Sequence, residues 1–368
     1  MRKTIFAMLV VTLAASPAHA QLGSLMKKAD SVAKAYDDWN FTDAEEHELG
    51  GEISTKLRDK YGVLQDKAVH KYVTLVGSVL AQQSSRPNLQ WTFIVLDTDG
   101  VNAFAAPGGF IHITRGALAL IQNEAELADV LGHEIGHVTE KHTINAIKKA
   151  KAGTAVTNAA GKAARSDFLK QVGDAMYSNI LENKYDRGDE TAADQVGVKL
   201  ANAAGWAPSG LSAFLTRLAE RNAGLKDRSG LFASHPETTS RIDAMKKTIA
   251  GQNLAAAALV QARYTQHITF KPVAVTAVAQ VAPPAATPAA PAASSTSGNM
   301  STPPTAGGGL GLGSLGALGR DKSSTQTVSS AGSRGVNPDR DAKGGAIKTL
   351  VTVTVTAAEV TEFKKGIA

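Results

Sequence analysis

Apolar side chains recur every three or four residues through most of the chain between residues 22 and 251. This spacing matches one face of an α-helix, and it is clearest over residues 67–83, 125–149, 190–204 and 209–221. Because these stretches fill much of the region, we expect helices to dominate the fold.

The pattern changes at residues 91–114. Three short runs rich in β-branched and aromatic residues occupy 91–96, 101–105 and 110–114, and the turn sequences DTDG and PGG separate them. A helix is expected from about Arg115. The sequence therefore predicts an α+β fold that is mainly α-helical and contains a small antiparallel sheet.

The first twenty residues have the pattern of a secretory signal peptide. A basic start at Arg2 and Lys3 precedes an apolar run and a small-residue ending, AHA, at 18–20. The apolar run is shorter than the about 20 residues that a spanning helix needs, so we expect cleavage before Gln21. The mature protein is then expected in the periplasm, with release beyond the cell left open. No later stretch predicts a transmembrane helix.

Composition divides the rest of the chain. Residues 21–255 have the composition of one globular domain, residues 256–273 contain RYTQHITF and predict one added strand, and residues 274–345 are rich in Pro, Ala, Gly and Ser. Such a stretch cannot bury enough apolar area to offset its ordering entropy, which predicts a disordered linker. Residues 346–368 alternate Thr with Val before a helix-like end, and form either a docking strand and helix or a sticky tail.

Charge and aromatic content argue against a nucleic-acid partner. The formal net charge is +6, two units of it from the leader, and it is spread in mixed-sign segments. Aromatic residues make up only 5% of the chain, and no basic run is interleaved with them. The chain also has no cysteine, so neither a disulfide framework nor a lipidated cysteine is available.

The stretch LGHEIGHVTEKH, residues 131–142, carries the most specific chemistry. His133 and His137 are four residues apart and project from one face of a helix, at the spacing that can hold one zinc ion. Glu134 stands beside the first ligand, where it can take a proton from a zinc-bound water. The alternative is an ordinary amphipathic helix. The apolar residues around the motif imply burial, however, and buried imidazoles without partners would cost several kcal/mol.

A catalytic zinc needs a third protein ligand and an open position. His142 follows His137 by five residues, about 140° round a continuous helix, so we expect it to point away from the ion as a structural or supporting residue. The sequence RGDETAADQVGVKL at 187–200 supplies the better candidates, because Glu190 and Asp194 share a helix face. A carboxylate from this helix would complete the site, and Asp194 would accept a hydrogen bond from a ligand histidine.

Together these segments resemble the family forty-eight zinc metallopeptidases, gluzincins that include the CAAX prenyl-protein and heat-shock envelope proteases, and in particular their soluble periplasmic type. HEIGHVTEKH is followed by R-x-x-E-x-x-A-D-x-x-G from Arg187. NAFAAPGGFIHITRGAL at 102–118 and SHPETTSRI at 234–242 agree with two further segments of the family. The resemblance covers roughly residues 45–250.

The resemblance implies roles for the residues of the zinc motif and of the second helix. It assigns one Zn²⁺ ion per chain to His133, His137 and Glu190, and the role of general base to Glu134. Asp194 would orient a ligand histidine, with Arg187 beside it.

It also implies how substrate binds. An extended polypeptide would pair with a sheet edge formed by Asn102, Ala103, Phe104 and Ala105. His235 would stabilise the developing oxyanion as a catalytic residue, or occupy the open zinc position in a latent form. A histidine before proline could equally be a cap or turn residue.

Departures from the family narrow the function. Residues 150–183 are rich in Ala, Gly and Lys and cannot span a bilayer, so prenyl-protein processing is not expected. The linker stands where soluble relatives often carry tetratricopeptide repeats, which leaves outer-membrane or envelope assembly partners open. We predict an exported zinc-dependent endopeptidase that hydrolyses peptide bonds of misfolded or unassembled envelope proteins through a zinc-activated water. The alternative is a periplasmic chaperone or outer-membrane assembly factor with a latent, closed zinc site.

Overall fold

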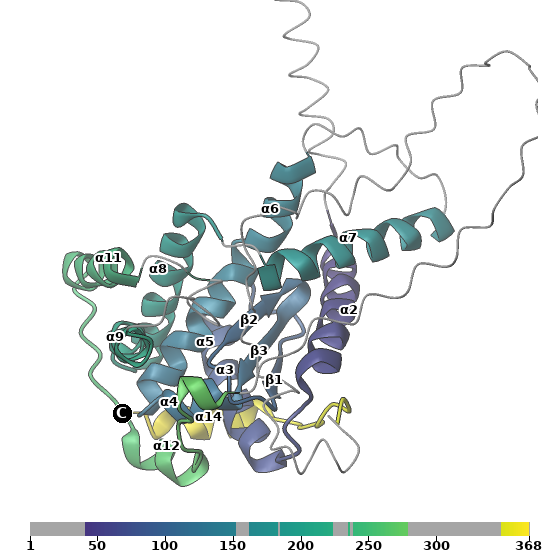
Figure 1. The fold of residues 1–368 in the computed structure, drawn as a ribbon. Coiled ribbons are helices and arrows are strands. Elements are labelled where there is room, and N and C mark those ends of the chain that lie inside the picture. The colour runs from purple at the N-terminus through teal and green to yellow at the C-terminus, as the bar shows by residue number, and fades with distance from the viewer. Residues whose placement is uncertain are drawn as a thin grey trace, which may run out of the picture.

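A computed structural model of the chain describes residues 41–151, 162–182, 185–223, 235, 238–278 and 347–367. The expected signal peptide and most of the expected linker lie outside these residues. Within them a small sheet is surrounded by helices (Figure 1), which confirms the predicted fold class. The elements in chain order are α2 (Asp43–Tyr61), α3 (Lys67–Gln83), β1 (Thr92–Leu96), β2 (Ala103–Ala106), the 3₁₀ turn η1 (Pro107–Gly109), β3 (Phe110–Thr114), α4 (Arg115–Leu120), α5 (Glu124–Thr139), α6 (His142–Lys151), α7 (Lys162–Glu182), α8 (Arg187–Ala204), α9 (Gly210–Arg221), α11 (Thr238–Gly251), α12 (Gln261–His267), η2 (Val275–Ala277) and α14 (Ala357–Lys365).

The three strands form a mixed sheet in the order β1-β3-β2. β2 and β3 are an antiparallel hairpin, in which Ala103 pairs with Ile113. β1, however, runs parallel to β3, with Thr92 opposite Phe110. The fully antiparallel sheet expected from the sequence is therefore wrong. The chain crosses from β1 to the far side of the sheet, and the apolar strand β3, buried along its whole length, inserts between the two strands that precede it.

Each face of the sheet packs against its own set of helices. Alternate side chains, such as those of Ile111 and Ile113, join the apolar cluster of α3, α5 and α9. Side chains at the other positions, such as Phe110 in β3 and Phe104 in β2, join a second cluster with residues of α2 and α7. This is the period-two alternation of a sheet buried on both faces. It fixes α5, the helix of the histidine motif, against one face.

Small residues bring α5 and α8 into close contact. A Cβ atom added at Gly197 would lie 2.9 Å from the backbone nitrogen of His133, and one at Gly136 would lie 2.9 Å from Cα of Ala193. The two helices lie side by side in Figure 1. Their backbones can approach this closely only because these positions carry little or no side chain. The approach carries the carboxylates of α8 to the histidines of α5.

The single helix expected over residues 125–149 is instead two helices. α5 ends at Thr139, and α6 begins at His142. Between them Lys141 has φ of 56°, in the left-handed region that interrupts an α-helix. The break changes the direction of the chain before His142, with a consequence for the site described below.

The C-terminal segment returns to the core. Residues 347–356 are extended, and the backbone N–H of Val63 donates to the carbonyl of Ile347 over 2.7 Å. α14 then packs on α3, burying Val360, and Ile367 is buried beside it. Of the two alternatives left by the sequence, the described residues show the docked one.

One expected strand is wrong. Residues 261–267, inside the predicted added strand at 256–273, form helix α12. In this stretch only Ala258 makes a β-type bridge, with Trp206. The buried ring of Tyr264, whose hydroxyl donates to the carbonyl of Leu118, anchors the helix to the core. Tertiary packing has here overridden a weak strand propensity. Among the described residues, no helix is both long and apolar enough to cross a lipid bilayer.

Candidate metal centre and active site

Four buried side chains converge where α5 meets α8. One potential ligand atom from each of His133, His137, Glu190 and His235 lies within 4.8 Å of every other. Nε2 of His133 lies 3.0 Å from Nε2 of His137, and Nε2 of His137 lies 3.5 Å from Oε1 of Glu190. Two ligands of one tetrahedral zinc ion lie about 3.3 Å apart, since each is about 2.0–2.1 Å from the metal. The residues therefore fit a tetrahedral metal ion in both chemistry and spacing.

The nitrogen of His133 that faces away from this group has a carboxylate partner. Its Nδ1 lies 2.9 Å from Oδ1 of Asp194. Arg241 in turn donates from Nε and Nη2 to the two oxygens of Asp194, over 2.9 and 2.6 Å, and its Nη1 lies 2.8 Å from Oε2 of Glu190. A carboxylate of this kind fixes the tautomer and the orientation of a ligand imidazole. Asp194 thus lies where the sequence predicts it.

Arg241 is a site residue that the sequence reasoning missed. It is buried, and the pair of carboxylates raises its pKa even though burial acts in the opposite direction. Arg241 is the arginine of the segment SHPETTSRI, which resembles the family, but no role was predicted for it. The expected cation, Arg187, is instead exposed at the first turn of α8. The structure does not bring Arg187 into the buried group.

Glu134 is buried beside the ligand group. Neither oxygen accepts a hydrogen bond from the residues that the structure describes, and Nε2 of His235 is 3.8 Å from Oε1. Burial raises the pKa of Glu134. A buried carboxylate without partners is costly, and a raised pKa brings a carboxylate closer to that of an effective general base at neutral pH.

His235 lies inside the ligand group. Its Nδ1 is 2.8 Å from Oε1 of Glu190 and 3.2 Å from Nε2 of His133. At these distances the ring can provide a fourth ligand to the same ion, as the predicted latent alternative requires. An oxyanion donor would instead leave the fourth position to water.

A small cavity opens beside these residues. Its polar wall is formed by four of the groups described above, His133, Glu134, His235 and Arg241. Its apolar wall comes from α5 and α9. The apolar residues are Val130, Leu211 and Leu215. The cavity borders the Glu134 carboxylate.

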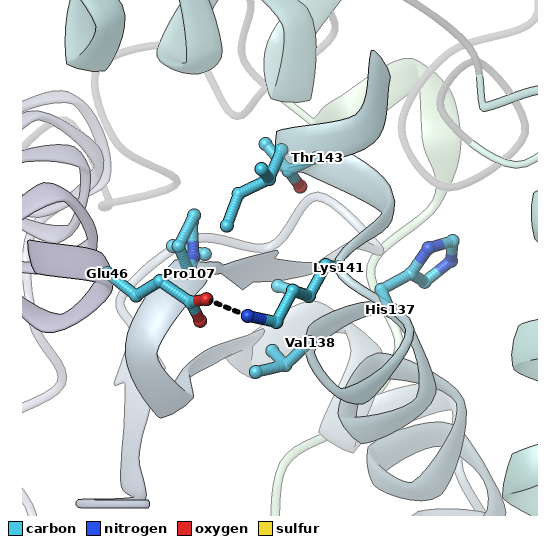
Figure 2. A pocket seen from close by; sticks show the side chains of 9 residues that line it. Glu46, Pro107, His137, Val138, Lys141 and Thr143 are labelled. Carbon is cyan, nitrogen blue, oxygen red and sulfur yellow. Dashed lines mark ion pairs between the residues drawn. The ribbon is translucent and has the colours of Figure 1, made fainter. Parts of the chain in front are cut away.

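A second pocket lies at the end of α5 but belongs to a different feature. Lys141 and the buried Glu46 form an ion pair across it, over 2.5 Å, and Arg86 holds the other oxygen of Glu46 over 2.8 Å. Figure 2 shows the ring of His137 pointing away from Glu46, Pro107 and Lys141. The pocket therefore joins α2 to the α5–α6 break and is not the metal site.

The predicted substrate edge is the outer strand of the described sheet. Ala103, Phe104 and Ala105 lie in β2, and Asn102 precedes it and caps its first N–H with its own side chain over 2.9 Å. All four are buried. An extended polypeptide could pair with β2 only after the groups that cover the strand have moved.

Comparisons with known proteins agree with this geometry. Residues 67–249 match peptidase family M48. The beta-barrel assembly-enhancing protease of Yersinia pestis is 25% identical over 206 residues, which cover 54% of this chain and 42% of the relative. The metalloprotease YcaL of Escherichia coli is 31% identical over 157 residues, 42% of this chain and 60% of the relative.

A third relative is covered more fully. The metalloprotease LoiP of Escherichia coli is 25% identical over 216 residues, 57% of this chain and 83% of the relative. In contrast, the chain spans only about two fifths of the length of the assembly-enhancing proteases it matches. The matched region contains the histidine motif, the carboxylates of α8 and the segment around His235, so the chain belongs to peptidase family M48.

Proposed function

We propose that the protein is an exported zinc endopeptidase acting on misfolded or unassembled envelope proteins. One observation carries the proposal. His133, His137 and Glu190 present ligand atoms at tetrahedral spacing. The carboxylate of Glu134, which accepts no hydrogen bond from the described residues, lies directly beside them. A structural metal site would not need a buried, unpaired base at its edge.

Zinc, when bound, supplies a Lewis acid that polarises the scissile carbonyl and acidifies water. The side chains supply the rest of the chemistry. Glu134 takes the proton from the attacking water and passes it to the leaving amine. Asp194 and Arg241 hold His133 and Glu190 in place, through the contacts given above.

The proposed substrate class follows from the place of β2. A strand that pairs with β2 would be held through its backbone, and such recognition reads extended chain more than particular side chains. Misfolded or unassembled proteins expose extended chain. The leader-like residues 1–20 and the name of the assembly-enhancing relatives support the bacterial envelope as the place of action and envelope assembly proteins as partners.

His235 favours a site that is closed at rest. Its Nδ1 lies at ligand distance from the group, so in this state it competes with water for the fourth position. The same observation supports the second candidate function, a chaperone or assembly factor whose zinc site stays shut. The two functions differ in whether His235 ever leaves the fourth metal position and admits water.

The test measures zinc per chain and casein cleavage for the parent, Glu190→Ala and His235→Ala. We expect about one zinc and measurable cleavage in the parent, and loss of both in Glu190→Ala. If His235 closes the site, His235→Ala keeps zinc and cleaves faster; if it holds the oxyanion, cleavage falls. Zinc binding without cleavage in both the parent and His235→Ala would favour the chaperone, and a parent without zinc would contradict the proposal.

A further inference from the structure

His137 has a buried polar neighbour on the side of its ring that faces away from the ligand group. Nδ1 of His142 lies 3.0 Å from Nδ1 of His137. Both side chains are buried. On its other side His142 faces a carboxylate, since its Nε2 lies 3.7 Å from Oδ1 of Asp189.

The break between α5 and α6 makes this contact. On a continuous helix a residue five positions after His137 would be about 140° away. The helix is interrupted at Lys141, which has φ of 56°, and α6 starts in a new direction at His142. The imidazole is thereby turned back toward the ring from which helical periodicity would separate it.

The surroundings of the two imidazoles indicate which Nδ1 donates and which accepts in this hydrogen bond. Nε2 of His137 faces Nε2 of His133 over 3.0 Å and Glu190 over 3.5 Å, so this nitrogen is the one available as a ligand and must be unprotonated to bind a metal. The proton of a neutral His137 ring is then on Nδ1. That N–H donates to Nδ1 of His142, whose own proton is on Nε2 and faces Asp189.

A second contact restrains a different motion of the same ring. Tyr185 stacks on His137, with ring centroids 4.0 Å apart and planes 26° from parallel. Its hydroxyl is 2.9 Å from Oγ1 of Thr143. Stacking limits tilting of the imidazole out of its plane, but it leaves rotation within the plane free. The contact with His142 restrains that rotation.

We propose that His142 is a positioning residue for the metal centre, holding His137 in the tautomer and orientation that a metal ligand needs. The negative charge of Asp189, 3.7 Å from Nε2 of His142, favours the proton on that nitrogen. His142 does for His137 what Asp194 does for His133. The assignment rests on the proposed function only in requiring that the centre binds a metal. The sequence indicated only a structural or supporting residue at this position, and the structure adds its contact with His137.

The test is zinc affinity, measured by competition with a chromogenic chelator, for the parent, His142→Ala and His142→Asn. Loss of a hydrogen-bonding partner of a ligand histidine typically weakens metal binding about 10- to 100-fold, and we expect this for His142→Ala. Asparagine places an acceptor near the position of Nδ1, so His142→Asn should recover most of the affinity. Asp189→Asn, at a half-buried position, should show a smaller loss in the same direction.

A matched control and a spectroscopic readout separate positioning from general damage. His70 is also buried, and its Nε2 contacts the carbonyl of Leu64 away from the site, so His70→Asn should leave zinc affinity unchanged. In the cobalt-substituted protein, the visible absorption bands should shift in His142→Ala and return in His142→Asn. If the parent binds zinc but His142→Ala binds it equally well with an unchanged cobalt spectrum, the role of His142 is contradicted and the proposed function stands. A parent that binds no zinc would overturn both.

Discussion

Burying imidazoles and carboxylates costs several kcal/mol unless each polar atom finds a partner. At the metal centre most of these atoms have one. Arg241 forms ion pairs with both Asp194 and Glu190. Burial lowers the pKa of His137 well below its usual value, so its ring is neutral, as a metal ligand must be. Three groups of the centre have atoms without a hydrogen bond among the described residues: Nδ1 of His133, Oε2 of Glu190 and both oxygens of Glu134. The first two lie 2.9 and 2.8 Å from a charged side chain, whereas the contact of Glu134 with His235 is longer, at 3.8 Å. The largest cost of a buried carboxylate therefore falls at the position where a base is needed.

His112, remote from the centre, gives a residue-scale prediction about pH. It is buried in β3, with Nε2 2.9 Å from Oγ of Ser54, and burial lowers its pKa to about 3 in the folded protein. Its pKa in the unfolded chain is about 6.5. The folded pKa is the lower one, so the stability contributed by neutral His112 is complete above about pH 6.5 and is lost as pH falls from there toward 3. The loss between pH 7 and pH 5 is about 2 kcal/mol.

Urea unfolding at pH 7 and pH 5 checks this value. The parent should lose about 2 kcal/mol more than His112→Asn over the interval, because asparagine does not titrate there. Equal losses in the two proteins would show that His112 does not carry this part of the acid sensitivity.

The sequence could predict those site residues that helical spacing alone brings together. The pair His133 and His137 follows from a four-residue interval, and Glu190 with Asp194 from another. Arg241 and Tyr185 are brought to the centre by tertiary packing, which periodicity does not encode. His142 was expected to support the site from outside the ligand group, but its contact with His137 could not be predicted, because helical spacing was extended across the break at Lys141.

At the scale of elements, the helices were predictable and their arrangement was not. A strong apolar period predicts a helix wherever packing does not oppose it. The parallel pairing of β1 with β3 depends on which strand occupies the centre of the sheet, and a run of buried residues looks the same in either position. The close approach of α5 and α8 depends on glycines whose importance is visible only once both helices are in place.

Gly197→Ala tests that close approach. The added methyl would lie 2.9 Å from the backbone nitrogen of His133, so the two helices must separate. We expect a loss of about 1–3 kcal/mol in unfolding free energy together with weaker zinc binding, because Glu190 moves with α8. Gly251→Ala is the control, since nothing lies within 4 Å of its added Cβ, and it should change neither property. Parent-like zinc binding in Gly197→Ala would mean that the ligand geometry does not depend on this contact.

In the whole molecule, the C-terminal segment, residues 347–367, packs against α3. Lys71 pairs with Glu359 over 2.6 Å, and the guanidinium of Arg263 lies 3.9 Å from the ring centre of Phe363. Arg263 also pairs with the buried Glu124 at the start of α5. Through Arg263, the C-terminal segment is thus connected to α5, the helix of the metal centre.

Two isoleucine-to-alanine substitutions test whether the C-terminal segment stabilises the fold. Ile367 is 2% exposed and Ile347 is 44% exposed. Ile367→Ala should lower the unfolding free energy by about 2 kcal/mol or more, whereas Ile347→Ala should change it by less than about 0.5 kcal/mol. Both should keep one zinc per chain. Equal stabilities of the two variants would show that the segment is not part of the cooperative fold.

In the proposed function, Glu134 performs the proton transfers of peptide hydrolysis at a bound zinc ion. Casein cleavage by the parent and by Glu134→Gln, compared at matched zinc content, tests it most directly. Glutamine has nearly the same shape but cannot accept the proton, so we expect zinc to be retained and cleavage to fall by about 100-fold or more. Cleavage by Glu134→Gln at the rate of the parent would contradict the claim.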